Sequence, residues 1–225
     1  MQLAALRSRI AAAAARAGRR AEDVRIVAVT KGHPLARAQA AAAAGLLDLG
    51  ENRVQEALAK QAAWTGAPPA LRWHLIGHLQ RNKARAAVGR FALIHSLDSI
   101  RLADALEAAA AAAGLVQDVL VEVNVAREPQ KTGALPDDAA ALVRHAASLP
   151  HLAPRGLMAI APFTPDPAIP RQVFRRLREI RDGVATSGLD LGVLSMGMSN
   201  DFEVAVEEGA TLLRLGTILF GERPT

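Results

Sequence analysis

The chain has 225 residues, 51% of them hydrophobic, which predicts a single domain over residues 1–225 with one substantial core. It contains no cysteine, which excludes disulfides and thiolate metal sites, and it shows neither a membrane span nor a secretory signal, so we expect a soluble cytoplasmic protein. The formal net charge is +5, and the arginines are scattered along the chain rather than gathered in a basic run. Few aromatic residues are available to stack on bases, so we expect a solvated basic surface and no nucleic-acid partner. A modest positive charge would also suit a small anionic ligand.

Helical and strand-like patterns alternate along the chain. Pro34 opens one helix, Asn52 is placed to cap the next, and Asp98 or Ser99 is placed to cap a long alanine-rich one. In chain order the predicted elements are helix 3–17, strand 26–31, helix 34–44, strand 48–51, helix 53–63, strand 72–77, helix 80–88, strand 92–95, helix 99–113, strand 119–125, helix 136–148, strand 155–160, helix 171–186, strand 192–196, helix 200–208 and strand 211–215.

Eight strands that alternate with helices, at this chain length, predict an α/β fold. The expected architecture is a (β/α)8 TIM barrel with an extra N-terminal helix. An open doubly wound sheet is the alternative. In either fold, ligands bind where the parallel strands end, so polar residues at those ends are the candidates for function.

Lys31 is the first of these candidates. It follows an apolar run that reads as a buried strand. A lysine held partly out of water at such an edge can lose its proton and attack a carbonyl. The plainer alternative is a surface lysine that extends from the rim of the barrel into solvent.

Arg214 is unusual because it lies inside LLRLG, an apolar strand that we expect to be covered on both faces. A guanidinium stays protonated there, and an unpaired buried charge costs several kcal/mol, so it needs an acceptor. Two acceptors are open at this point. One is a barrel carboxylate such as Glu122, and the other is an atom of a ligand.

Glycine-containing turns follow the last two predicted strands. The turn MGMSN includes Ser199 and Asn200, and Gly216-Thr217 follows the final strand. Barrel enzymes frequently bind a phosphate at these loops, where glycine lets the backbone approach and N–H groups point at the anion. Ser199 and Asn200 have an ordinary alternative role as helix caps, with Glu203 completing a capping box. The two roles are compatible.

Other chemistries lack their motifs. His74 and His78 lie along one strand and its exit, about 13 Å apart, so they cannot share a metal ion, and we expect no metal. Neither a Walker motif nor a GxSxG turn is present.

A lysine, an arginine donor and a phosphate cup together indicate pyridoxal 5′-phosphate (PLP) as the ligand. A sugar phosphate held by a Schiff-base aldolase is an alternative.

The sequence resembles the pyridoxal-phosphate homeostasis protein family, whose fold is the barrel of the alanine racemase N-terminal domain. The resemblance runs in order through nearly the whole chain. The matching motifs are VAVTK (27–31), GENRVQEA (50–57), WHLIGHLQRNKAR (73–85), HSLDS (95–99), VEVNVAREPQKTG (121–133), GLMAI (156–160), LSMGMSNDFEVAVEEGAT (194–211) and LRLGTILFG (213–221).

The resemblance also implies roles for single residues. It implies that Lys31 forms the Schiff base with PLP and that Arg214 faces the pyridine nitrogen. Ser199, Gly216 and Thr217 match the family's phosphate contacts. The remaining matches are vaguer: a polar residue near the ring at Asn52, a cofactor contact at Met196, and unassigned roles for His78, Asn82 and Lys131.

The family implies a protein that holds PLP and maintains its intracellular supply, without substrate turnover and with no catalytic residue. The chemistry agrees, because an arginine leaves the pyridine nitrogen unprotonated, which makes the ring a poor electron sink. Alanine racemases share that arginine, but they also need a tyrosine as the opposite acid–base group, and this chain has none. The alternative is a small PLP-dependent racemase or transaminating enzyme. PLP-dependent apo-enzymes are the candidate recipients, and we expect a monomer or weak homodimer.

Overall fold

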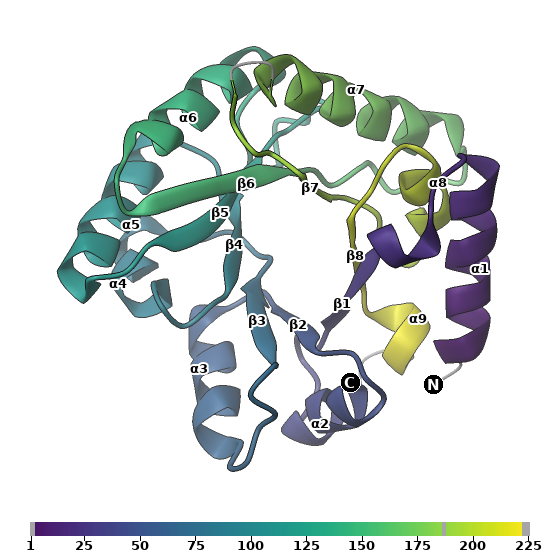
Figure 1. Cartoon of the computed structure of the whole chain (residues 1–225), viewed down its shortest axis with the longest axis horizontal. Helices are drawn as coiled ribbons and strands as arrows, with labels where there is room; N and C mark the ends of the chain where they lie inside the picture. The colour runs from purple at the N-terminus through teal and green to yellow at the C-terminus, as the bar shows by residue number, and fades with distance from the viewer. Residues whose placement is uncertain (1–2, 186–187, 222–225) are drawn as a thin grey trace.

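The computed structural model describes residues 3–185 and 188–221. Eight parallel strands form a closed barrel in the order β1 to β8, with helices around its outside (Figure 1). The strands are β1 (Arg25–Val29), β2 (Asp48–Glu51), β3 (Arg72–Leu75), β4 (Leu93–Leu97), β5 (Gln117–Glu122), β6 (Leu152–Met158), β7 (Val193–Ser195) and β8 (Leu212–Leu215). The (β/α)8 prediction is therefore confirmed, and the doubly wound alternative is wrong.

The predicted helices are present with small changes of boundary. The α-helices are α1 (Leu3–Arg16), α2 (Leu35–Ala43), α3 (Val54–Ala63), α4 (Ala84–Ala87), α5 (Ile100–Ala113), α6 (Pro136–Ser148), α7 (Ala168–Ala185), α8 (Phe202–Glu207) and α9 (Thr217–Phe220). Two short 3-10 helices, η1 (Ala21–Asp23) and η2 (Arg81–Lys83), complete the set. None of the helices in the described ranges is long and apolar enough to cross a membrane.

Several local predictions need correction. The helix expected over 80–88 begins as the 3-10 turn η2 before it becomes α4. Helix α7 starts at Ala168 rather than at 171, because Pro170 is tolerated in a first helical turn. Its predicted end, Thr186, lies outside the described residues. The N-cap of α3 is Arg53 and not Asn52.

Two layers of apolar side chains follow from the alternation of strand residues. One face of each strand packs against the helices, and this shell contains most of the core. The other face fills the inside of the barrel with a smaller cluster, whose buried members lie on β1, β4, β5, β6 and β8 and in the loop after β3. The inside members are Val27, Val29, Ile76, Leu93, Leu120, Met158 and Leu212. A side chain that continues this inward alternation past a strand end reaches the mouth of the barrel.

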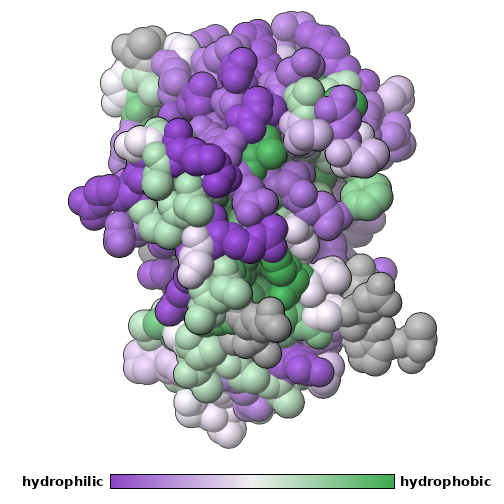
Figure 2. Space-filling view, turned by 90° about the vertical axis from the view of Figure 1, so that its right-hand side faces the viewer, coloured by the Kyte–Doolittle hydropathy of each residue, from purple (hydrophilic) through white to green (hydrophobic). Residues whose placement is uncertain are grey.

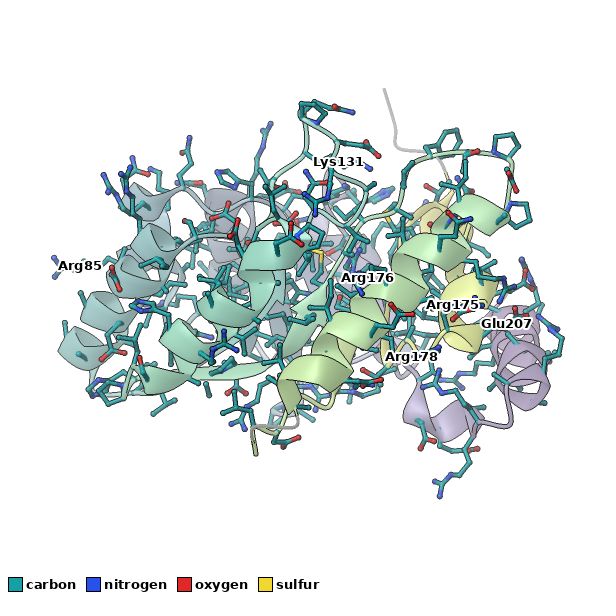
Figure 3. The ribbon with its side chains drawn as sticks, turned by 90° about the horizontal axis from the view of Figure 1, so that it is seen from above. Arg85, Lys131, Arg175, Arg176, Arg178 and Glu207 are labelled. Carbon is teal, nitrogen blue, oxygen red and sulfur yellow. The ribbon has the colours of Figure 1, made fainter. Side chains whose placement is uncertain are left out.

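The extra helix α1 packs against α8. Arg9 forms an ion pair with Glu203 at 3.0 Å, and its guanidinium lies 4.6 Å from the ring centre of Phe202. In Figure 2, which shows this side of the molecule, hydrophilic side chains dominate the upper half and hydrophobic ones gather in the lower half. On the other side of α8, Arg175 and Arg178 of α7, both labelled in Figure 3, form ion pairs with Glu208, the residue that follows α8. Helix α8 is therefore held by α1 at its first turn and by α7 at its C-terminal end.

Candidate functional site

Lys31 lies in the turn between β1 and α2, at the mouth of the barrel. Val27 and Val29 of β1 point into the barrel, and Lys31 follows at the same alternation, half-buried. The turn also contacts the last helix, because the rings of His33 and Phe220 lie 5.4 Å apart. The structure thus places the turn that carries Lys31 beside the end of β8.

Arg214 points into the barrel from β8 and is almost completely buried, with 4% of its surface exposed. Its Nη1 donates to Ser195 Oγ at 2.7 Å, and its Nη2 donates to the carbonyl oxygen of Ala159 at 2.9 Å. No carboxylate in the described residues lies within ion-pairing distance of it, so the pairing with Glu122, one of the two acceptors left open by the sequence, is wrong. A guanidinium has five N–H groups, and these two bonds leave donors for a ligand.

A line of polar side chains continues from Arg214 through the interior of the barrel. Ser195 Oγ lies 2.9 Å from His95 Nδ1, and His95 Nε2 lies 2.9 Å from His74 Nδ1. His74 Nε2 in turn lies 2.8 Å from the carboxylate of Asp48. One assignment of protons satisfies all of these contacts. The Ser195 hydroxyl donates to His95 Nδ1, His95 Nε2 donates to His74 Nδ1, and the remaining ring N–H donates to the Asp48 carboxylate. Each histidine then carries one proton and is neutral. We refer to these five residues as the interior relay.

Electrostatics agree with a neutral His95 at one end of this contact and a charged Asp48 at the other. Burial, and then the neighbouring His74 and Arg214, lower the pKa of His95 well below its usual value. Burial alone would raise the pKa of Asp48, but the hydrogen bonds from Arg72 and His74 outweigh it and bring that pKa far below its usual value. Burial lowers the pKa of Arg214 to about 10, so Arg214 remains a cation at neutral pH. The relay therefore runs from a fixed cation to a fixed anion.

The neutral state of His95 predicts how stability depends on pH. Unfolded histidine takes up a proton below about pH 6.5, whereas folded His95 does not, so the free energy of unfolding falls as the pH falls below that value. The slope from this one group reaches about 1.4 kcal/mol per pH unit. In urea titrations between pH 7 and pH 5, His95→Gln should show a smaller pH slope than the wild type. Equal slopes would contradict a neutral His95.

The two turns of the expected phosphate cup meet in the structure. Ser199 Oγ accepts a hydrogen bond of 3.2 Å from the backbone N–H of Ile218, in the first turn of α9. Within the described ranges, no protein acceptor occupies the backbone N–H groups of Gly216 and Thr217. Asn200 and Glu203 do not form the expected capping box, because the residue that precedes α8 is Asp201, which instead accepts from the N–H of Met198 at 2.6 Å.

Asn52 and Met196 occupy different environments. Asn52 is half-buried in the turn after β2, and a Cβ on Gly77 would lie 2.5 Å from its carbonyl oxygen, so only glycine lets the turns after β2 and β3 approach this closely. Met196 is fully buried in the shell between strands and helices. Its side chain therefore faces away from the mouth of the barrel, and only its main chain is placed to meet a ligand there.

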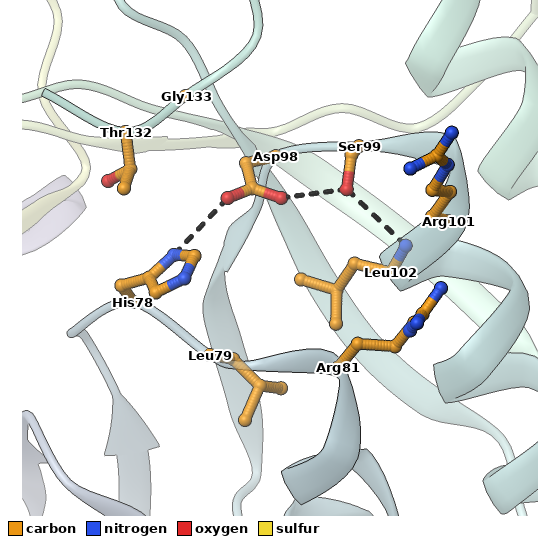
Figure 4. A pocket seen from close by; sticks show the side chains of 9 residues that line it. All are labelled: His78, Leu79, Arg81, Asp98, Ser99, Arg101, Leu102, Thr132 and Gly133. Carbon is orange, nitrogen blue, oxygen red and sulfur yellow. Dashed lines mark hydrogen bonds and ion pairs between the residues drawn. The ribbon is translucent and has the colours of Figure 1, made fainter.

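A pocket of about 520 Å³ lies beside this mouth, where β3, β4 and β5 end (Figure 4). His78 pairs with Asp98 across it at 3.2 Å, and Asp98 also accepts from the hydroxyl of Ser99, which caps α5. Arg81 and Arg101 line its outer side. None of the residues predicted to contact PLP lines this pocket. Lys131 is on the neighbouring loop, where it pairs with Glu128, and Asn82 is exposed on η2.

Sequence reasoning missed the interior relay. The available signal was the polar residue at alternate positions of strands that otherwise read as buried: Asp48, His74, His95 and Ser195. Alternation alone does not say which of these side chains meet, since His95 and Ser195 are 100 residues apart in the chain.

Comparisons with known proteins identify the family of this chain. The model of the family "Alanine racemase, N-terminal domain" matches residues 1–224. The pyridoxal phosphate homeostasis protein of Aquifex aeolicus is 44% identical over 223 residues, which cover 99% of this chain and 97% of that relative. The corresponding protein of Pseudomonas aeruginosa is 43% identical, covering 98% of this chain and 94% of its own.

Solved structures give the same result. PipY of Synechococcus elongatus, solved with PLP bound, superposes with a TM-score of 0.82 at 43% identity, covering 88% of this chain and 93% of that one. Alanine racemase from Clostridium difficile, at 15% identity and a TM-score of 0.74, shares the fold. The chain belongs to the pyridoxal phosphate homeostasis protein family, built on the alanine racemase N-terminal domain.

Proposed function

We propose that this protein binds PLP and maintains its intracellular supply, with Lys31 as the amine that holds the aldehyde as a Schiff base. The observation that carries the proposal is the meeting of three chemistries at one end of the barrel. A lysine, a buried arginine with spare N–H donors, and backbone N–H groups that have no acceptor among the described residues lie on the neighbouring strand ends of β1 and β8. When bound, PLP supplies an aldehyde that condenses with an amine and releases one water.

The residues present fit this ligand at its three reactive points. The cup formed by Ser199, Gly216 and Thr217 would take the phosphate, because its N–H and O–H groups are the donors a dianion needs. Arg214 would donate to the pyridine nitrogen through an N–H group that its two protein contacts leave unused. Asn52 and the main chain of Met196 would border the ring.

The same residues favour a protein that holds the cofactor without converting a substrate. Arg214 is a permanent donor at neutral pH, so it stabilises an unprotonated pyridine nitrogen, which withdraws electrons weakly. The chain contains no tyrosine to act as a proton donor on the opposite face. We therefore propose a non-catalytic carrier, with PLP-dependent apo-enzymes as recipients. PLP homeostasis is the named role of the relatives in Aquifex and Pseudomonas.

A direct test is available because the chain has only four lysines, at positions 31, 60, 83 and 131. The protein mixed with PLP should develop visible absorbance, and borohydride reduction followed by peptide mass spectrometry should place the label on Lys31. Incubation of the loaded protein with amino acids should yield neither racemised product nor keto acid. A label at Lys83 or Lys131, or appreciable turnover, would overturn the proposal.

The phosphate cup gives a separate prediction. Ser199→Ala should weaken PLP binding by about 1–3 kcal/mol, because a hydrogen bond to a charged phosphate is lost. Binding of pyridoxal, which lacks the phosphate, should be unchanged. Titration of both ligands against both proteins measures this difference. Equal losses for the two ligands, or no loss for PLP, would place Ser199 outside the cup.

A further inference from the structure

Lys60 is a buried lysine that the proposed function does not use. It lies on α3 with 8% of its surface exposed. Its Nζ donates to the carbonyl oxygen of Thr30 at 2.8 Å, to Glu51 Oε1 at 2.6 Å and to Glu56 Oε1 at 2.9 Å. An ammonium has three N–H donors, so all of them are taken. Lys60 is therefore not available as an amine for an aldehyde.

These contacts hold the backbone on both sides of Lys31. The carbonyl of Thr30, which is part of the peptide bond to Lys31, accepts from Lys60. The backbone N–H of Gly32, on the other side, donates to Glu56 Oε1 at 2.7 Å. The side chain of Thr30 also donates to Glu51 Oε1 at 2.6 Å. The group formed by Thr30, Glu51, Glu56 and Lys60 is called the clamp below.

Packing alone does not explain the clamp. Glu51 Oε2 is buried and has no hydrogen-bond partner among the described residues. Burying an ammonium and a carboxylate costs several kcal/mol per ion, and apolar residues of similar volume often serve stability as well or better. The polar arrangement instead gives directional contacts to two particular peptide groups. Those groups belong to a turn in which Gly32 has a φ of 71°, so the turn departs from regular structure.

We propose that Lys60 is a positioning residue, which acts through the clamp to hold the turn that carries Lys31 in the geometry for aldehyde capture. The inference rests on the proposed function, because it assumes that Lys31 is the capturing amine. A misplacement of about 1 Å is enough to cost such a reaction up to about a hundredfold. Lys60 itself touches neither the aldehyde nor the amine.

Two ligands separate positioning from general damage. PLP can condense with Lys31, whereas pyridoxine 5′-phosphate has an alcohol in place of the aldehyde and can use only the phosphate and ring contacts. For Lys60→Met, we expect the Kd for PLP to rise about 10- to 100-fold and borohydride labelling of Lys31 to slow. The Kd for pyridoxine 5′-phosphate should stay within about twofold of the wild type.

Matched variants complete the design. Lys83→Met removes a lysine whose side chain makes no hydrogen bond or ion pair within the described residues, and it should leave both affinities unchanged. Glu56→Ala loses the acceptor for Gly32 and should reproduce the effect of Lys60→Met. Glu56→Gln keeps an oxygen acceptor there and should recover most of the PLP affinity. If Lys60→Met fails to fold, the Glu56 pair of variants still decides the matter.

The results that overturn the inference are distinct from those that overturn the proposed function. Equal losses for the two ligands in Lys60→Met and Glu56→Ala, or unchanged binding of PLP, would show that the clamp does not position Lys31. A wild-type protein in which PLP labels a lysine other than Lys31 would instead refute the proposed function.

Discussion

Lys31→Ala should abolish the visible absorbance that PLP acquires on this protein and should remove the borohydride label. The reason is that the covalent bond needs a primary amine, and the other lysine at this end of β1, Lys60, has its three donors occupied. Folding should change little, since a half-buried turn lysine contributes within about 0.5 kcal/mol to stability. Absorbance spectra and thermal melting of the same samples measure both effects.

The control for this experiment is Lys131→Ala. Lys131 is also half-buried, on the loop after β5, and it pairs with Glu128 at 3.0 Å. Its replacement should leave the absorbance and the label intact. A persistent band in Lys31→Ala would mean that a different lysine holds the aldehyde, and mass spectrometry would identify which one.

Arg214→Gln should weaken PLP binding by about 1.5–3 kcal/mol, or roughly 10- to 100-fold in Kd, because a hydrogen bond from a charged donor to the ring nitrogen is lost. The comparison ligand is the PLP analogue in which that nitrogen is replaced by C–H. It has no acceptor at this position, so the wild type should bind it more weakly than PLP. In Arg214→Gln the two ligands should bind about equally.

This comparison separates ring recognition from structural damage. Removing the guanidinium also leaves Ser195 and the carbonyl of Ala159 without their donor, which lowers the affinity for every ligand if the mouth of the barrel deforms. Such a general loss affects both ligands alike. If the wild type already binds the two equally, Arg214 does not face the ring nitrogen.

Local patterns explain why the barrel could be predicted. Apolar runs such as VLVEVNV indicate strands, and proline or glycine marks where helices begin and end. The predicted bounds of the eight strands therefore lie within a few residues of those in the structure. Errors fell at boundaries, where a short 3-10 turn or a proline in a first turn changes where a helix begins. The strand ends also pointed to Lys31, Arg214 and the two glycine turns, because the C-terminal edge of a parallel barrel gathers them whatever the register.

What the sequence determined by itself was the order of the elements and the residues that follow each strand, since each depends on local spacing along the chain. The pairing of β1 with β8, which closes the sheet and excludes the open alternative, was visible only in the tertiary structure. Only the tertiary structure decided which charges meet. It gave Arg214 a serine and a carbonyl rather than Glu122, one of the two acceptors that the sequence left open, and it joined Lys60 of α3 to the peptide group before Lys31. The physical reason is that a buried charge takes whatever acceptors lie within about 3 Å of it, and those acceptors come from strands and helices far apart in the chain.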